Sequence, residues 1–170
     1  SITTDIKNTT VTDNIYGGGN NGDVGDDVTL SIDSTTLTTV YGGGNNASVD
    51  GDITLTITNE SEIKGSVYGG GNEGVTTGSI TTEISDTTIT NNVFGGGNNG
   101  NVGSDVTLTI DSTTLTTVYG GGNNADVGGN ITLTISNNSE IKDSVYGGGN
   151  EGETLGGTTS TLTDVIVTNS

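Results

Sequence analysis

The stretch VYGGGN at Val67 to Asn72 returns along the whole chain at a nearly constant interval. Its aromatic residue falls at Tyr16, Tyr41, Tyr68, Phe94, Tyr119 and Tyr146, which gives intervals of 25, 27, 26, 25 and 27 residues. A fixed period of this size indicates a repeat architecture in which each unit forms one element of a stacked array.

A longer period lies above this one. A shift of 78 residues places GDDVTLSIDSTTLTTVYGGGNN, residues 25–46, on GSDVTLTIDSTTLTTVYGGGNN, residues 103–124. The sequence therefore predicts a single repeat array over residues 1–170, with about six and a half coils and an internal 78-residue duplication. Because the first and last units are partial and no capping sequence is evident, we expect the chain to be an excerpt of a longer protein.

Each unit contains a segment in which apolar and polar residues alternate, such as Ile53-Thr54-Leu55-Thr56-Ile57. This period of two is typical of a strand with one buried face, and no segment has the 3.6-residue period of a helix. A propeller blade needs about 40 residues, whereas 25 to 27 residues fit one coil of three short strands. The prediction is an all-β, single-stranded parallel β-solenoid, expected to be right-handed, with one coil per unit.

Composition and charge limit the classes of binding partner that we expect. The chain has 21 Asp and Glu against three Lys, and its net charge is -18. This charge repels phosphate backbones and anionic lipid, so neither nucleic acid binding nor membrane insertion is expected. Low hydrophobicity with high charge is also typical of disorder, but the strict periodicity argues against that alternative.

The repeated motif has a structural interpretation. We expect the glycines, as at Gly17 to Gly19, to form a corner of the coil, either by adopting positive φ or by letting backbones approach closely. The asparagine after them would form an amide ladder between coils, and the aromatics would stack in a column. The predicted asparagine ladder consists of Asn20, Asn45, Asn72, Asn98, Asn123 and Asn150.

Catalysis is not expected. The GGGNNG match to a dinucleotide-binding fingerprint at Gly17 to Gly22 recurs in every unit and precedes no helix. The chain has no His, Cys or Arg, and the acid pair Asp26 and Asp27 lies at a repeated turn without further catalytic groups. We expect no cofactor, although stacked turn carboxylates leave calcium open as a weak alternative. The candidate calcium ligands are Asp23, Asp26, Asp27, Asp50 and Asp52.

Threonine occupies one outward position of the alternating strand in every unit: Thr3, Thr29, Thr54, Thr81, Thr107, Thr132 and Thr159. This file weakly resembles the ice-binding face of β-helical antifreeze proteins, which makes ice binding an alternative function. Asp5 and Glu83 interrupt the neighbouring file, so ordinary β-propensity of Thr is the competing explanation. Carbohydrate recognition on a flat polar face is a third alternative.

Over its whole length the chain resembles tandem V-Y/F-G-G-G-N repeats of large bacterial cell-surface proteins, which are adhesin-like. The resemblance implies an extracellular or wall-attached stalk, spacer or fibre segment that is not an enzyme. Its expected partners are flanking repeats of the same protein, copies of itself through end-to-end or other association, and a host or surface ligand of unknown identity.

Overall fold

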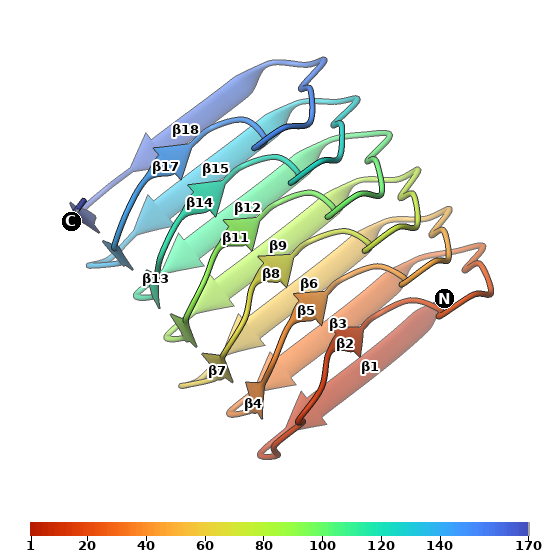
Figure 1. The fold of residues 1–170 in the computed structure, drawn as a ribbon, viewed down its shortest axis with the longest axis horizontal. Helices are drawn as coiled ribbons and strands as arrows, with labels where there is room; N and C mark the ends of the chain where they lie inside the picture. Colours follow the sequence, from red (N-terminus) through yellow and green to blue (C-terminus); the bar gives the residue numbers. More distant parts are fainter. Residues whose placement is uncertain (170) are drawn as a thin grey trace.

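The computed structural model describes residues 1–169, which form an all-β solenoid of six complete coils and the start of a seventh. Successive coils add strands to three parallel sheets and advance along one axis from the N-terminus to the C-terminus (Figure 1). The first coil joins the second sheet only through a single bridge from Thr10 to Thr36. The winding is right-handed, because in Figure 1 the long strands at the back run towards the lower left, the front segments return towards the upper right, and the coils advance towards the upper left. The predicted fold is confirmed.

The three sheets differ in strand length. The long-strand sheet consists of β1 (Ile2–Lys7), β3 (Val28–Asp33), β6 (Ile53–Thr58), β9 (Ile80–Ser85), β12 (Val106–Asp111), β15 (Ile131–Ser136) and β18 (Thr158–Leu162). The second sheet consists of β4 (Thr36–Leu37), β7 (Glu62–Ile63), β10 (Thr88–Ile89), β13 (Thr114–Leu115), β16 (Glu140–Ile141) and β19 (Ile166–Val167). The tyrosine sheet consists of β2 (Ile15–Tyr16), β5 (Val40–Tyr41), β8 (Val67–Tyr68), β11 (Val93–Phe94), β14 (Val118–Tyr119) and β17 (Val145–Tyr146).

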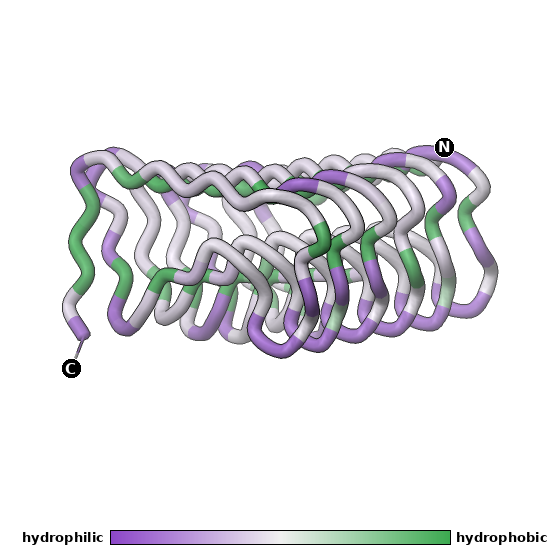
Figure 2. The backbone as a smooth tube through the Cα atoms, turned by 90° about the horizontal axis from the view of Figure 1, so that it is seen from above, coloured by the Kyte–Doolittle hydropathy of each residue, from purple (hydrophilic) through white to green (hydrophobic). Residues whose placement is uncertain are grey.

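The core follows from the alternation along the long strands. Leu30, Leu55, Leu108 and Leu133 point inward and are fully buried. The residues directly before and after each leucine on the same strand face outward. Figure 2 shows hydrophobic residues at matching places in successive coils, which is the arrangement that lets like side chains stack. Because each coil covers the apolar side chains of the next, the core consists of two stacked clusters that run through successive coils, one containing Leu55 and the other Ile53.

One inward position departs from this pattern. Thr82 on β9 takes the place of leucine, pairs in register with Leu55 and Leu108, and is fully buried. Its hydroxyl is the one buried side-chain polar atom within residues 1–169 that has no hydrogen-bond partner. The residues 78 positions away on either side are Thr4 and Ser160, so this polar substitution returns once in every three coils.

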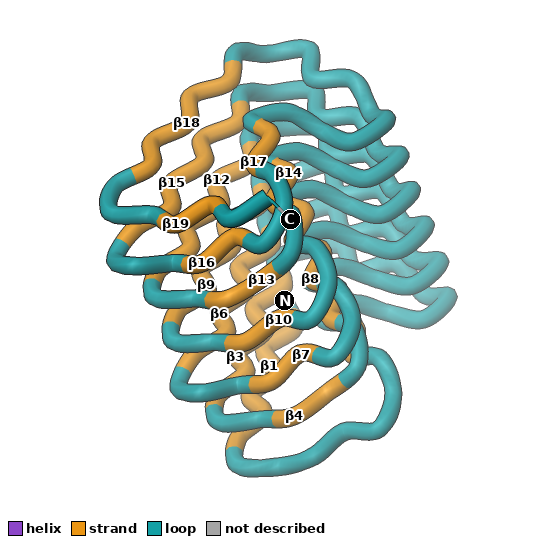
Figure 3. Tube along the Cα trace, turned by 60° about the vertical axis from the view of Figure 1, so that its left-hand side comes forward, coloured by secondary structure: helices purple, strands orange, loops and turns teal. Residues whose placement is uncertain are grey.

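Two kinds of corner close each coil. The corner after each long strand contains residues with positive φ, such as Ser34 and Ser112, and the two 27-residue intervals have two such residues in succession, Asn59 with Glu60 and Asn137 with Asn138. Part of the variation in repeat length therefore lies at this corner. The segment from the glycines to the next long strand is loop, joined between coils by single bridges such as Val24 with Val49 (Figure 3).

Candidate functional surfaces

At the corner formed by the glycines after each aromatic residue, which we call the glycine corner, the backbones of neighbouring coils approach closely and no glycine among residues 1–169 adopts positive φ. The positive-φ part of the expectation for Gly17 to Gly19 is therefore wrong. A Cβ on Gly95 would overlap the carbonyl oxygen of Gly120 in the next coil, and Gly17 and Gly42 meet the same obstacle. The carbonyl of one coil thus lies directly against the Cα of the other, in the manner of a Cα–H···O contact. The absence of a side chain is what lets these backbones touch.

The asparagine after the glycines forms the predicted ladder. Each side-chain amide nitrogen donates to the amide oxygen of the preceding coil at 2.9 Å, as Asn98 does to Asn72 and Asn123 to Asn98. The same bond joins the other members from Asn20 to Asn150. These amides satisfy one another along the axis, so the loop is held between coils by side chains as well as by backbone.

A second, interrupted amide ladder lies one residue further on, and it was not predicted from the sequence. Asn46 donates to Asn21 at 3.1 Å, Asn124 donates to Asn99 at 2.9 Å, and Asn99 donates to the carboxylate of Glu73 at 2.9 Å. The NN pairs in the sequence were its signal. Because these side chains are exposed, they contribute less to stability than the first ladder.

The aromatic side chains stack in one column. Successive ring centroids from Tyr16 to Tyr146 are 4.9 Å apart, and the interplanar angles are between 2° and 11°. Burial raises the pKa of Tyr41 to about 12, and the neighbouring phenols of Tyr68 and Tyr16 make a smaller contribution in the same direction. Burial also raises the pKa of Tyr68 and of Tyr119. Because the rings cover one another's faces, the interior of the column offers only ring edges to solvent, which does not suit stacking on a sugar.

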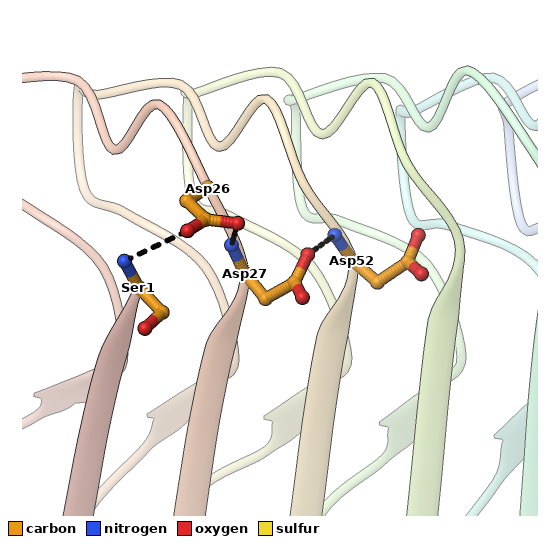
Figure 4. Close-up of polar contacts among 4 residues, drawn as sticks. All are labelled: Ser1, Asp26, Asp27 and Asp52. Carbon is orange, nitrogen blue, oxygen red and sulfur yellow. Dashed lines mark hydrogen bonds and ion pairs between the residues drawn. The ribbon is translucent and has the colours of Figure 1, made fainter.

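The acidic turns use their carboxylates to bind backbone amides. Asp27 accepts the amide of Asp52 at 2.9 Å, Asp52 accepts the amide of Ser79 at 2.7 Å, and Asp26 accepts the amide of Asp27 and the N-terminal amine (Figure 4). The Asp27 amide, and after it the amine of Ser1, lowers the pKa of Asp26. The turn carboxylates thus satisfy backbone donors that a loop would otherwise leave unpaired.

The candidate calcium ligands are not gathered into one site. Asp23 accepts the amide of Ser48 at 2.8 Å in the next coil, as Asp27 does for Asp52. Across residues 1–169, no three His, Cys, Asp or Glu side chains lie close enough together to hold a metal ion. Calcium binding by Asp23, Asp26, Asp27, Asp50 and Asp52 stays a prediction. The geometry gives the carboxylates of Asp23, Asp26, Asp27 and Asp52 a structural role as acceptors of backbone amides.

The outward threonines of the long-strand sheet form one file in register. Parallel pairing joins Thr3 to Thr29, and the file continues through Thr54, Thr81, Thr107 and Thr132 to Thr159. The second outward file contains Asp5 and Glu83, and Lys7 binds Asp5 at 3.0 Å. The threonine file of this face is therefore regular along the solenoid axis, whereas the file beside it contains charged side chains.

A polar groove of about 830 Å³ lies at the corner between the long-strand sheet and the second sheet, and sequence reasoning did not identify it. Residues from four coils line it, among them Ser34, Glu60, Glu62, Asp86 and Ser112. The glutamates belong to a 27-residue unit, whose extra corner residue places Glu60 at positive φ. Residues from four units meet here only because the coils stack, which no single unit reveals.

No helix in the described residues is long and apolar enough to cross a membrane. No family model, curated protein or solved structure matches this chain. The surfaces described above are therefore the basis for inferring its function.

Proposed function

We propose that the chain is a structural segment, a stalk, spacer or fibre element, of a large adhesin-like protein on the outside of a bacterial cell. The observation that supports this role most is axial continuity. All three sheets, the Asn20 to Asn150 ladder and the aromatic column run from coil to coil without interruption. A rod held by nearest-neighbour contacts of this kind transmits position along its axis and can be lengthened by adding units.

The charge of the chain suits this role. A net charge of -18 keeps neighbouring rods in solution and discourages random lateral aggregation. The pattern-level resemblance to tandem repeats of bacterial surface proteins supports the extracellular location. The proposal includes no catalytic step and no cofactor.

A length series tests the stalk. Chains with one, two and three extra copies of the 78-residue unit, residues 15–92, should show a maximum dimension in small-angle X-ray scattering that grows by about 14 Å per unit, since three coils rise about 4.8 Å each. Linear growth at constant cross-section supports a rod. A radius of gyration that rises with a compact-domain exponent, or a flexible-chain profile, would refute it. Antibodies against the chain should also label intact cells of its source.

Ice binding is the second candidate, and the unbroken Thr3 to Thr159 file is the observation that favours it. Stacked threonines about 4.8 Å apart along the axis form a flat, repetitive hydroxyl and methyl array. Thermal hysteresis and faceted ice crystals in the presence of the chain would support it. The matched variant replaces Thr54, Thr81 and Thr107 by lysine, which should remove the activity and leave the length series unchanged.

A further inference from the structure

The outward face of the second sheet has a charge pattern unlike the rest of the chain. Two of the three lysines, Lys64 and Lys142, lie on it, each two residues after an outward glutamate, Glu62 or Glu140. The other outward positions between and before them are threonines, and exposed Ile166 continues the glutamate file at the C-terminal end. The threonines are Thr36, Thr38, Thr88, Thr90, Thr114 and Thr116. We name this set of residues the Glu/Lys face. It has two positive and two negative charges, whereas the whole chain has a net charge of -18.

The charges on this face are not paired within the chain. The ion pairs among residues 1–169 join Ser1 to Asp26 and Lys7 to Asp5, and neither involves Lys64 or Lys142. Both lysines and Glu62 are exposed. Parallel pairing places Glu62 between Thr36 and Thr88, so the glutamates form one file with threonines and the lysines lie beside that file. The face thus offers a free acid and a free base about 6.6 Å apart in every third coil.

We propose that this face binds a second copy of the chain, side by side, parallel and in register. A two-fold axis that runs along the solenoid between the two files exchanges the glutamate file with the lysine file. Glu62 of one protomer then meets Lys64 of the other, and Glu140 meets Lys142 three coils later, which gives four ion pairs in an isologous interface. A two-fold axis across the solenoid would instead place glutamate opposite glutamate, so the antiparallel arrangement is disfavoured.

The size of the face sets the strength of the pairing. A strip about 10 Å wide and six coils long covers about 300 Å² on each protomer, well below the roughly 800 Å² of a standard interface. Exposed ion pairs add little to the free energy of association. Association of this chain is therefore weak, and it strengthens as more coils lie in register. The parallel polarity suits stalks that start from one surface, a consequence that rests on the proposed function, whereas the pairing itself does not.

Paramagnetic broadening detects such an interface. A nitroxide on Thr36→Cys, in a chain of natural isotope abundance, is mixed at millimolar concentration with the ¹⁵N-labelled chain. The parallel pair predicts at least a twofold loss of amide intensity centred on Thr38. Broadening centred on Ile166, at the far end of the same file, would establish an antiparallel pair and overturn the proposal, as would broadening on another face or none at all.

Charge variants test the complementarity. Lys64→Glu with Lys142→Glu, and Glu62→Lys with Glu140→Lys, each place like charges on both files, so each variant alone should lose the broadening. An equimolar mixture of the two should restore it, although both chains remain strongly negative. Lys7→Glu is the control, because it removes the third lysine from the long-strand sheet and should leave the broadening intact. Failure of the mixture would refute the pairing and leave the length series, and thus the stalk, untouched.

Discussion

The glycine corner and the leucine core stack like residues on like residues, but they tolerate change very differently. At the corner, the backbone of one coil touches the backbone of the next, and a Cβ on Gly95 would overlap the Gly120 carbonyl. In the core, side chains fill the space between coils, and Thr82 replaces leucine without breaking the register with Leu55 and Leu108. A contact between two backbones cannot rearrange to accept an added side chain. A column of stacked side chains accepts a smaller or more polar residue, with some loss of stability.

The largest expected effect breaks the corner. Gly95→Ala inserts a methyl group against the Gly120 carbonyl and the Val106 side chain. Because backbone is on the opposing side, we expect the free energy of unfolding to fall by about 3 kcal/mol or more. Urea denaturation followed by circular dichroism measures it. Gly25→Ala is the control, since nothing lies within 4 Å of its Cβ, and it should change stability by no more than about 0.5 kcal/mol. Equal effects of the two variants would contradict the close-approach explanation.

A smaller effect separates the two amide ladders beside the corner. Asn98→Ala removes two partly buried hydrogen bonds, to Asn72 and from Asn123, and leaves both partners unsatisfied. We expect a loss of about 2 kcal/mol. Asn99→Ala removes two exposed bonds and should cost about 0.5 kcal/mol. The same denaturation measurement compares them, and a larger loss for Asn99→Ala would reverse our ranking of the ladders.

A substitution at the polar core position should raise the stability of the chain. Thr82→Val keeps the shape of the side chain and removes a buried hydroxyl that has no partner, so we expect stability to rise by about 1 kcal/mol. Thr81→Val, on the outward side of the same strand, should change it by less than about 0.5 kcal/mol. A loss of stability in Thr82→Val would show that the hydroxyl is satisfied in solution, for example by a buried water molecule.

The last effect is confined to alkaline pH. Burial raises the pKa of Tyr41, next to Gly42, from an ordinary 10.0 to about 12, so between these values the folded chain holds a proton that the unfolded chain has lost. Its contribution to stability is complete below pH 10 and disappears as the pH rises towards 12. Ultraviolet titration of the phenolates should show the tyrosine that ionises near pH 12 in the wild type and not in Tyr41→Phe, while the raised pKa values of Tyr68 and Tyr119 persist in both. An ordinary titration in both would place Tyr41 in solvent.

Much of the fold could be predicted because the same sequence pattern recurs in every unit. The alternation in Ile53 to Ile57 specified the buried face, and the period of the aromatics specified the coil. The Asn20 to Asn150 ladder followed from the same logic, since equivalent residues of a parallel stack must be neighbours.

Other features depend on details that the repeat does not encode. Positive φ occurs at Ser34 and Asp86 and not at the glycines, because non-glycine residues take the tight corner after the long strand and the glycines serve close approach. The turn acids read as candidate metal ligands because sequence shows their charge and hides the backbone amides that they bind. The groove beside Glu60 depends on how four coils combine.

The polar core position at Thr82 has a mechanical consequence. Since Thr4 and Ser160 lie 78 residues to either side, the coil in which a polar residue replaces the core leucine recurs at regular distances along the rod. Under tension, such a rod would yield at these coils first and extend in steps of one three-coil block. If the chain is the stalk segment that we propose, evenly spaced yield points would let it absorb a sudden pull and then refold, where a rod without them would resist until it failed at once.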